Sequence, residues 1–245
     1  MKILVCITHV PDTTSKINFK DNNTKFDSTG VQFIIGPYDD YALARAVELK
    51  ESTGSSLTVI NVGMAVTEPT IRKALAIGAD DAIRVNAEPV DSYFVAAQIA
   101  EQAKAGSFDL ILMGRESIDY NSGVVHGIVG ELLGIPSVSP VMKLDIEGTR
   151  GKLTREIEGG KELLEVSLPF VAGCQEPIAE WKIPNMRGIM SARTKPLKVV
   201  DAVPVDGGVE LQKYELPAPK GAVKMVSADN VPELVTLLKS EAKVL

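Results

Sequence analysis

The residues best suited to chemistry lie in one short loop, GRESIDYNSG, which spans residues 114–123. An apolar run, residues 109–113, precedes it, and an apolar helix-like stretch follows from Val124. Backbone N–H groups of Gly/Ser/Asn turns and the dipole at a helix start both attract anions. The candidate phosphate donors are Ser117, Asn121, Ser122 and the Gly123 amide. The alternative is an ordinary connection in which Asn121 or Ser122 caps the helix.

Other catalytic arrangements have little support. The chain has no G-x-G-x-x-G and no Walker lysine-serine pair. His9 and His126 are its two histidines, and no Cys/His/carboxylate spacing suggests a metal site. A triad of Ser117, Asp119 and His126 lacks the nucleophile elbow that such a serine needs. We expect Asp119 to fix the loop by accepting backbone N–H bonds, so binding is favoured over catalysis.

The elements that must position this loop alternate regularly. Strands are expected over residues 2–7, 57–62, 82–86 and 109–113, and helices over 36–54, 67–78, 91–106 and 124–133. Such alternation predicts an α/β fold with a doubly wound, mostly parallel, Rossmann-like sheet. Ligands of these sheets bind beyond the carboxyl ends of the strands, where the strand order reverses. The loop is therefore on the ligand-binding side.

Local signals give expectations for the helix ends and for the remaining chain. Asp39 or Asp40, Thr67 and Asp91 are expected to cap three helices. The segments KINF and VQFII should form a β excursion joined by the turn DNNT. Residues 137–174 are β-rich and should extend the sheet on an antiparallel edge. Regularity fades from Glu176, and a Pro/Gly-rich arm leads to a last short helix.

Composition excludes several classes of function. The net charge of −6 disfavours nucleic acid and anionic lipid as partners. No apolar stretch reaches the roughly 18 residues that a membrane span needs, so no membrane insertion is expected. The start of the sequence shows no signal-peptide pattern. Cys6 and Cys174 lie in apolar surroundings, which indicates buried, reduced thiols and a cytoplasmic location.

Six segments taken in order resemble the β subunit of electron transfer flavoproteins. They are KILVCITHVPDTT, GPYDDYALARAVELKE, TEPTIRKALAIGAD, the loop GRESIDYNSG with ELLGIP, REIEGGKELLEVSLP, and RGIMSARTKP. The resemblance covers essentially the whole chain. It implies a heterodimer whose α subunit holds most of the FAD. The dimer would carry electrons from dehydrogenases, such as acyl-CoA dehydrogenases, to a membrane quinone oxidoreductase, without autonomous catalysis by this subunit.

The resemblance also implies a structural AMP in this subunit. The residues that it assigns to the AMP site are Cys6, Gly36, Pro37, Tyr38, Asp39, Val62, Gly114, Arg115, Glu116, Ser117, Ile118, Asp119, Tyr120, Asn121, Ser122, Gly123, Val124 and Val125. Two positions depart from the family pattern. Val124 stands where many relatives have a donor glutamine, and His126 stands in place of a glycine. His126 is expected either to add a phosphate contact or, preferably, to face solvent.

Partner docking is the second implied function. Residues 176–198 resemble the family's recognition loop, in which an apolar anchor enters a dehydrogenase. The anchor is Met186 or Ile183, according to the alignment. The remaining residues assigned to this surface are Arg187, Ile189, Met190, Arg193 and Lys195. Glu156 is implied to touch the flavin domain.

The implied organisation has three parts: an adenine-nucleotide-binding domain over residues 1–175, the recognition region over 176–198, and a C-terminal arm and helix over 199–245 that pack on the α subunit. Leu234, Leu237 and Leu238 would supply the apolar face of that helix.

Two alternative functions stay open. Some relatives bifurcate electrons and hold a second FAD in place of AMP, with NADH nearby, although their longer loop after the third strand is missing here. An adenine-nucleotide-hydrolysing enzyme is the other alternative, but the segment ITHVPDTT after the first strand is not the Gly-rich loop of such enzymes. Flavin stoichiometry and ATP turnover distinguish these readings.

Overall fold

Two units make up the chain, which a computed structural model describes over residues 1–205 and 208–245. The larger unit comprises Met1–Asn18 and Asp27–Leu211, and the smaller comprises Phe19–Phe26 and Gln212–Leu245. The predicted organisation into a nucleotide domain, a recognition region and an arm assigns functions to these segments and stays a prediction. Residues 206 and 207, which the predicted arm includes, lie outside the described residues.

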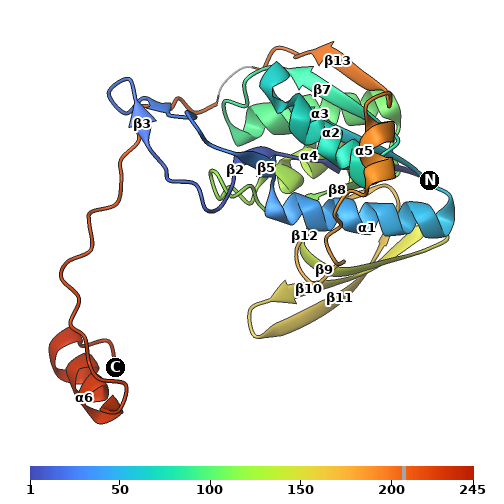
Figure 1. Ribbon diagram of the computed structural model, residues 1–245. Coiled ribbons are helices and arrows are strands. Elements are labelled where there is room, and N and C mark those ends of the chain that lie inside the picture. The colour runs from blue at the N-terminus through green and yellow to red at the C-terminus, as the bar shows by residue number, and fades with distance from the viewer. Residues whose placement is uncertain (206–207) are drawn as a thin grey trace. The chain divides into compact units, whose positions relative to one another are not determined.

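A nine-stranded sheet forms the centre of the larger unit (Figure 1). Its strands, in spatial order, are β11 (Gly160–Ser167), β10 (Arg150–Ile157), β9 (Ser137–Glu147), β12 (Phe170–Cys174), β8 (Leu110–Gly114), β1 (Lys2–Cys6), β6 (Ser56–Val62), β7 (Asp81–Asn86) and β13 (Leu197–Asp201). In this spatial order, each strand from β9 through β12, β8, β1, β6 and β7 to β13 is parallel to the next. The strand β10 pairs antiparallel with both β9 and β11. The predicted α/β class with a mostly parallel sheet is confirmed.

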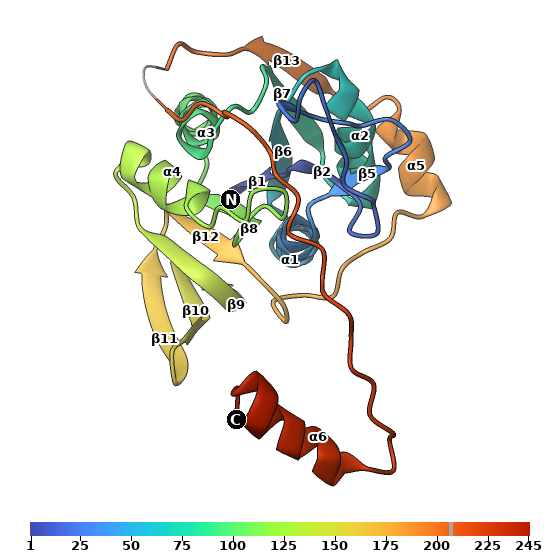
Figure 2. The same ribbon diagram turned by 90° about the vertical axis from the view of Figure 1, so that its left-hand side faces the viewer.

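Helices cover both faces of this sheet. They are α1 (Pro37–Thr53), α2 (Glu68–Ile77), α3 (Ser92–Gly106), α4 (Val125–Leu133) and α5 (Met186–Ala192), with a 3₁₀ turn, η1 (Ala65–Thr67), before α2. Figure 2 shows α3 and α4 on one side of the sheet and α1, α2 and α5 on the other. A separate apolar core lies on each side, because the central strands bury side chains in both directions.

Three features of the sheet differ from the expectation. The β-rich region does not lie wholly at an antiparallel edge, because β12 runs parallel between β9 and β8. The edge strand β13 was not expected, because its short run of apolar residues, Leu197, Val199 and Val200, follows a basic stretch and three of its five residues are exposed. The β excursion pairs differently: β5 (Phe33–Ile35) pairs with β2 (His9–Pro11), while the turn DNNT joins β3 (Phe19–Lys20) to β4 (Lys25–Phe26).

Helix ends follow the predicted chemistry only in part. Asp91 caps α3 by accepting from the backbone N–H of Phe94 at 2.7 Å, as expected. The cap expected at Asp39 or Asp40 is wrong, because both aspartates lie inside the first turn of α1. Thr67 does occupy the N-cap position of α2, but its side chain makes no capping bond, because its hydroxyl donates backwards to the carbonyl of Met64. Asp39 instead accepts hydrogen bonds from Thr8 and Gly114, which are distant from it along the chain.

The smaller unit joins an early hairpin to the late part of the sequence. The ring of Tyr214 stacks on Phe19 with centroids 4.6 Å apart, and the Tyr214 amide donates to the carbonyl of Asn23 at 2.7 Å. Further on, α6 (Val231–Leu237) is capped by Asn230 and runs into a π-helical turn, η2 (Leu238–Ala242). No residue of α6 is buried, and the side chains of Val231, Leu234 and Val235 are exposed.

Candidate functional site

The strand order reverses at β1. From β1 the chain proceeds through α1 to β6 on one side and on to β7, and it then returns to the other side of β1 to form β8. This reversal separates the loops at the carboxyl ends of β1 and β8, which is where open parallel sheets receive ligands. Cys6 ends β1 and Gly114 ends β8, so the predicted site residues on both strands meet at this edge.

Asp39 connects these two strand ends. One of its carboxylate oxygens, Oδ2, accepts from the Thr8 amide at 2.8 Å and from the Thr8 hydroxyl at 2.6 Å. The other, Oδ1, accepts from the Gly114 amide at 2.8 Å. The side chain is 3% exposed, and a buried carboxylate needs such donors to offset its desolvation. Asp39 therefore fixes the start of α1 against both β1 and β8.

Close backbone contacts at this edge require glycine. A Cβ on Gly36 would lie 2.4 Å from the Thr8 hydroxyl and 2.6 Å from the Asp39 carboxylate. A Cβ on Gly114 would lie 2.7 Å from both Asp39 Oδ1 and the Cβ of Tyr38. Neither space can accept a side chain without displacing the bridge. The predicted residues Gly36 and Gly114 thus both lie against Asp39, and Gly114 also lies against Tyr38.

Burial dominates the electrostatics of this edge. It raises the pKa of Asp39 to about 6, while the hydrogen bonds from Thr8 and Gly114 act in the opposite direction. Burial also raises the pKa of the Cys6 thiol well above its usual value and that of Cys174 to about 12, and the Asp39 carboxylate adds to both effects. Both cysteines are free and buried, so their thiols stay protonated and unreactive at neutral pH.

Arg115 is the second residue of the loop and has several partners. Its Nη1 donates to Gln175 Oε1 at 3.0 Å, and its Nη2 donates to the Tyr38 hydroxyl and to Glu116 Oε1, each at 3.1 Å. The guanidinium carbon also lies 4.7 Å from the centre of the Tyr38 ring. The buried Nε–H has no hydrogen-bond partner among the described residues. A donor therefore remains available beside the loop.

The middle of the loop is held by its own side chains. Asp119 Oδ1 accepts from the Ser117 hydroxyl and, at 3.0 Å, from the Tyr120 amide, as the sequence had led us to expect. Ser122 contacts Ser92 at the start of α3, with 2.6 Å between the hydroxyl oxygens. Asn121 has a left-handed backbone with φ of 49°. These contacts hold the loop beside the start of α4.

The start of α4 has no side-chain cap. Val124 occupies the N-cap position, so the capping expected from Asn121 or Ser122 is wrong. The N–H groups of the first helical turn have no partner within the helix, and no side chain replaces one at the cap. Of the other predicted residues, Tyr120, Asn121, Gly123 and Val124 are exposed, and Pro37, Ile118 and Val125 are partly buried. Cys6 and Val62 are buried in the core on the α3 side.

His126 does not face solvent, contrary to the expectation. Its Nδ1 lies 3.4 Å from the Ser137 hydroxyl, and a Cβ on Gly173 would lie 2.9 Å from the imidazole ring. Burial lowers the pKa of His126, and a hydrogen bond with the Gly123 backbone opposes this shift. The absence of a side chain at Gly173 makes room for the ring, so the histidine packs over β12 and holds the end of the loop.

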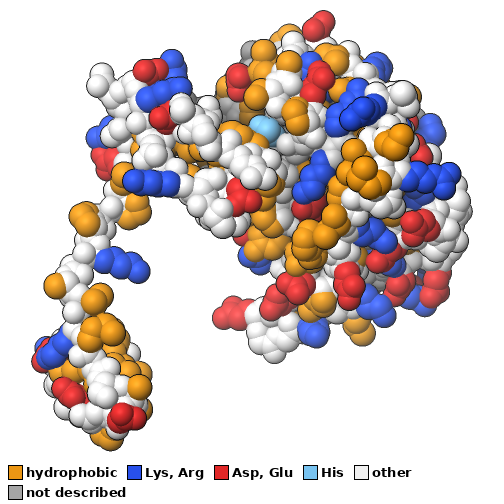
Figure 3. Space-filling model, in the orientation of Figure 1, with side chains coloured by type: hydrophobic (Ala, Val, Ile, Leu, Met, Phe, Trp, Pro, Cys, Tyr) orange, Lys and Arg blue, Asp and Glu red, His pale blue; other side chains and the backbone are white. Residues whose placement is uncertain are grey.

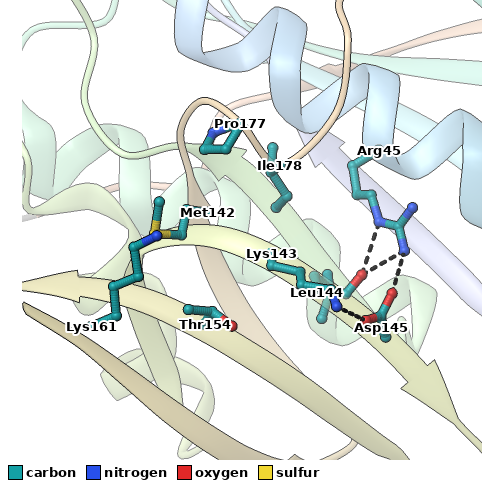
Figure 4. Close-up of a pocket in the computed structure, with 9 residues that line it drawn as sticks. All are labelled: Arg45, Met142, Lys143, Leu144, Asp145, Thr154, Lys161, Pro177 and Ile178. Carbon is teal, nitrogen blue, oxygen red and sulfur yellow. Dashed lines mark hydrogen bonds and ion pairs between the residues drawn. The ribbon is translucent and has the colours of Figure 1, made fainter.

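A hollow of about 490 Å³ lies elsewhere, between α1, β9, β10 and the segment after β12 (Figure 4). It is lined by Arg45, Met142, Lys143, Leu144, Asp145, Thr154, Lys161, Pro177 and Ile178. The Arg45 guanidinium is already bound to the Leu144 carbonyl and to Asp145. The hollow contains none of the predicted site residues. The candidate site is therefore located by the residues at the strand ends and not by the size of a cavity.

The predicted partner-binding residues surround the short helix α5. Asn185 caps it by accepting from the Gly188 amide at 2.8 Å. A Cβ on Gly188 would lie only 2.2 Å from the Ala76 carbonyl oxygen, so α5 packs almost directly on the backbone of α2. The opposite side of the helix is left exposed. Its apolar side chains, with their exposed fractions, are Met186 (73%), Met190 (68%) and Ile189 (41%), and Ile183 precedes them (74%).

Basic residues border this apolar surface, but not all are free to meet a partner. Figure 3 shows hydrophobic side chains beside basic ones over the position of α5, and Arg187 and Arg193 are exposed there. Lys195 instead donates to the Leu75 and Ala79 carbonyls at the end of α2, and burial lowers its pKa. Arg72 likewise donates to the carbonyls of Ala192 and Lys195. Lys195 therefore helps to hold α5 on α2.

Two residues that form the site were missed from the sequence. Thr8 supplies two of the three hydrogen bonds to Asp39, and its position just beyond the first strand was the available signal. Gln175 is 7% exposed and joins Arg115 to Glu156, whose Oε2 accepts from its Nε2 at 2.7 Å. Nothing in the local sequence singles out this glutamine, because both partners are distant along the chain.

Comparison with known proteins identifies the family. Residues 24–205 match the family model described as "Electron transfer flavoprotein domain". The chain belongs to this family. It is 36% identical to electron transfer flavoprotein subunit beta of Bacillus subtilis (strain 168), and the alignment covers all of both chains.

Two further electron transfer flavoprotein relatives agree with this family assignment. The chain is 36% identical to subunit beta of Syntrophomonas wolfei, over 91% of this chain and 88% of the relative. It is 29% identical to the human subunit beta, and the alignment covers 100% of this chain and 99% of the relative. The resemblance to the β subunit of electron transfer flavoproteins is therefore confirmed over the full length. Within the described ranges, no helix is long and apolar enough to cross a membrane, and no group of three or more His, Cys, Asp or Glu residues is placed to hold a metal ion.

Proposed function

We propose that this chain is the β subunit of a heterodimeric electron transfer flavoprotein, and that it binds AMP at the carboxyl edge of β1 and β8. The observation that carries this proposal is the Asp39 bridge, which holds both strand ends and the first turn of α1 in one rigid frame beside an uncapped helix. Such a frame suits binding, because it presents backbone donors without a nucleophile or base. The role is to support electron transfer by the FAD of the other subunit.

The residues at this edge fit an adenylate. The phosphate would lie against the amides at the start of α4, where the helix dipole and the unpaired N–H groups favour an anion. Arg115 offers positive charge and the buried Nε–H that lacks a partner in the described chain. Cys6 and Val62 supply apolar surface for the base at the ends of β1 and β6. Ser117 and Ser122 contribute hydroxyl groups from the loop.

The surface around α5 suits a dehydrogenase partner. Met186 and Met190 are long, flexible and mostly exposed, and such apolar anchors between basic residues are typical of binding hot spots. Arg187 and Arg193 add positive charge to an otherwise acidic protein, which speeds association with an acidic partner. Acyl-CoA or related dehydrogenases would deliver electrons here, and a membrane quinone oxidoreductase would accept them.

The α subunit would cover surfaces that this chain leaves open. The helix α6 has no buried residue, although Val231, Leu234 and Val235 are apolar. A helix with such a face gains stability by packing on another protein. We infer that the arm and α6 pack on the α subunit, which holds most of the FAD, and that Glu156 meets the flavin-bearing part of that subunit.

The test is to purify the chain with its α subunit, denature the complex, and identify the released small molecules by mass spectrometry. We expect one AMP and one FAD for each heterodimer. Release of two FAD molecules and no AMP would support a bifurcating subunit with an NADH site. Steady ATP turnover by the chain would instead indicate a nucleotide-hydrolysing enzyme. A complex that releases FAD but no nucleotide from this subunit would contradict the proposed AMP site.

A further inference from the structure

Gln175 lies between the candidate nucleotide loop and the exposed residue Glu156. It follows β12 directly and is 7% exposed. Its Oε1 accepts from Arg115 Nη1 at 3.0 Å, and its Nε2 donates to Glu156 Oε2 at 2.7 Å. A buried side-chain amide thus uses each of its ends on a charged group from a different element, one from the loop after β8 and one from β10.

The orientation of this amide is fixed by its two partners. A guanidinium can only donate hydrogen bonds and an ionised carboxylate can only accept them. If the amide turned over, its NH₂ group would face Arg115 and its oxygen would face Glu156, so both interactions would become repulsive. Hydrogen bonds to charged groups are also stronger than those between neutral groups. Gln175 therefore holds Arg115 and Glu156 in a defined relation.

Arg115 carries this restraint into the loop. Its backbone N–H donates to the Cys174 carbonyl at 2.9 Å, so β12 holds the residue through its backbone as well as through Gln175. The other end of its guanidinium reaches the Tyr38 hydroxyl and Glu116. Any displacement of Gln175 thus acts on Arg115, which lies near the beginning of the loop and contacts Tyr38 at the start of α1.

We propose that Gln175 is a positioning residue that couples the loop at residues 114–123 to Glu156. Restraint of Glu156 stiffens the loop, and occupation of the loop by an adenylate restrains Glu156, because coupling between two sites is reciprocal. The second half of this statement rests on the proposed AMP site, and the first half does not. A protein that contacts Glu156 and the nucleotide in the loop would then stabilise the same arrangement of the chain.

The test compares Glu156→Ala, Gln175→Met and the double variant with the parent protein as purified. Hydrogen–deuterium exchange of the amides at 115–123 is the first measurement. Each single variant should raise their exchange about threefold or more, and the double variant should add nothing further, since contacting residues are not additive. Glu158→Ala is the matched control, because Glu158 is an exposed glutamate on the same hairpin. Its loop exchange should equal that of the parent.

Gln175→Glu gives an independent variant. It keeps an acceptor for Arg115 and places a second carboxylate against Glu156, so the exchange at 115–123 should rise through loss of the Glu156 contact, but by no more than in Gln175→Met, where Arg115 also loses its acceptor. Retention of AMP is the second measurement: Glu156→Ala should lower AMP affinity about threefold when Gln175 is present and leave it unchanged in Gln175→Met. Parent protein without AMP would contradict the proposed function alone. Unchanged loop exchange in Glu156→Ala, or an equal rise in Glu158→Ala, would overturn the coupling.

Discussion

A single methyl group at Gly188 should disturb the packing of α5 more than any change on its exposed side. The added Cβ would lie 2.2 Å from the Ala76 carbonyl oxygen, whereas ordinary contacts begin at 3.4 Å. The difference, 3.4 − 2.2, means that α5 must move away from α2 by about 1.2 Å. The obstacle is a backbone atom inside a helix, which cannot rotate aside as a side chain can. Gly188→Ala should therefore loosen the whole α5 segment.

Two opposing contributions set the size of the effect. Alanine in place of glycine within a helix stabilises by up to about 1 kcal/mol, and overpacking costs about 1–3 kcal/mol. We expect a net loss of about 1–2 kcal/mol in the free energy of unfolding. Gly127 is the matched control, since it is the third residue of α4 as Gly188 is of α5, and a Cβ there meets no atom within 4 Å. Gly127→Ala should stabilise by up to about 1 kcal/mol.

Urea unfolding followed by far-ultraviolet circular dichroism measures both variants under one set of conditions. The midpoint should fall in Gly188→Ala and rise in Gly127→Ala, with similar slopes if the unfolded states are alike. The close contact of α5 with α2 would be refuted by a Gly188→Ala midpoint equal to or above that of the parent, provided that Gly127→Ala shows the expected rise. A fall in both variants would instead point to a general sensitivity of the helices.

Two further predictions concern the strand-end frame and the partner surface. Burial raises the pKa of Asp39 to about 6 from an ordinary value of 3.8, so the folded state binds this proton more tightly than the unfolded chain. The contribution of Asp39 to the free energy of unfolding is then complete below about pH 4 and is lost as the pH rises through about 6. The difference in urea midpoint between the parent and Asp39→Asn should therefore change between these pH values. A difference that stays constant would contradict the raised pKa. Met186→Ala should slow flavin reduction by the dehydrogenase about tenfold, as loss of a hot-spot side chain does, with unchanged flavin content. Ile183→Ala distinguishes the second candidate anchor, and normal kinetics in Met186→Ala would remove the first.

The alternating part of the fold could be predicted because its signals are local. The central strands β1 and β8 are buried on both faces and read as nearly continuous apolar runs, and β6 reads as a mainly apolar run that Thr58 and Asn61 interrupt. Gly54 and Gly134 end their helices with the left-handed backbone that glycine favours. What could not be predicted is the neighbour of each strand, since β12 has the same apolar character whether it lies at an edge or inside the sheet.

The sequence indicated the region of the candidate site but not the contacts within it. The loop at 114–123 could be identified from its composition and its place after a strand. Asp39 looked like a helix cap, because local rules cannot foresee that Thr8 and Gly114 would supply its donors. Lys195 looked like a partner-facing cation for the same reason, although its ammonium group binds carbonyls of α2. Asp39 and Lys195 both make their hydrogen bonds with groups that lie far from them along the chain, which their own segments do not reveal.

The stacking of Tyr214 on Phe19 has a consequence for the order in which the protein is made. On the ribosome, Tyr214 is added about 195 residues after Phe19 (214 − 19). The turn at Asn23, whose carbonyl receives the Tyr214 amide, is thus completed long before that amide exists. The small unit can close only late in translation, after the strands of the large sheet have emerged. The residues of the central sheet are therefore available for folding before the hairpin can join the segment that ends in α6.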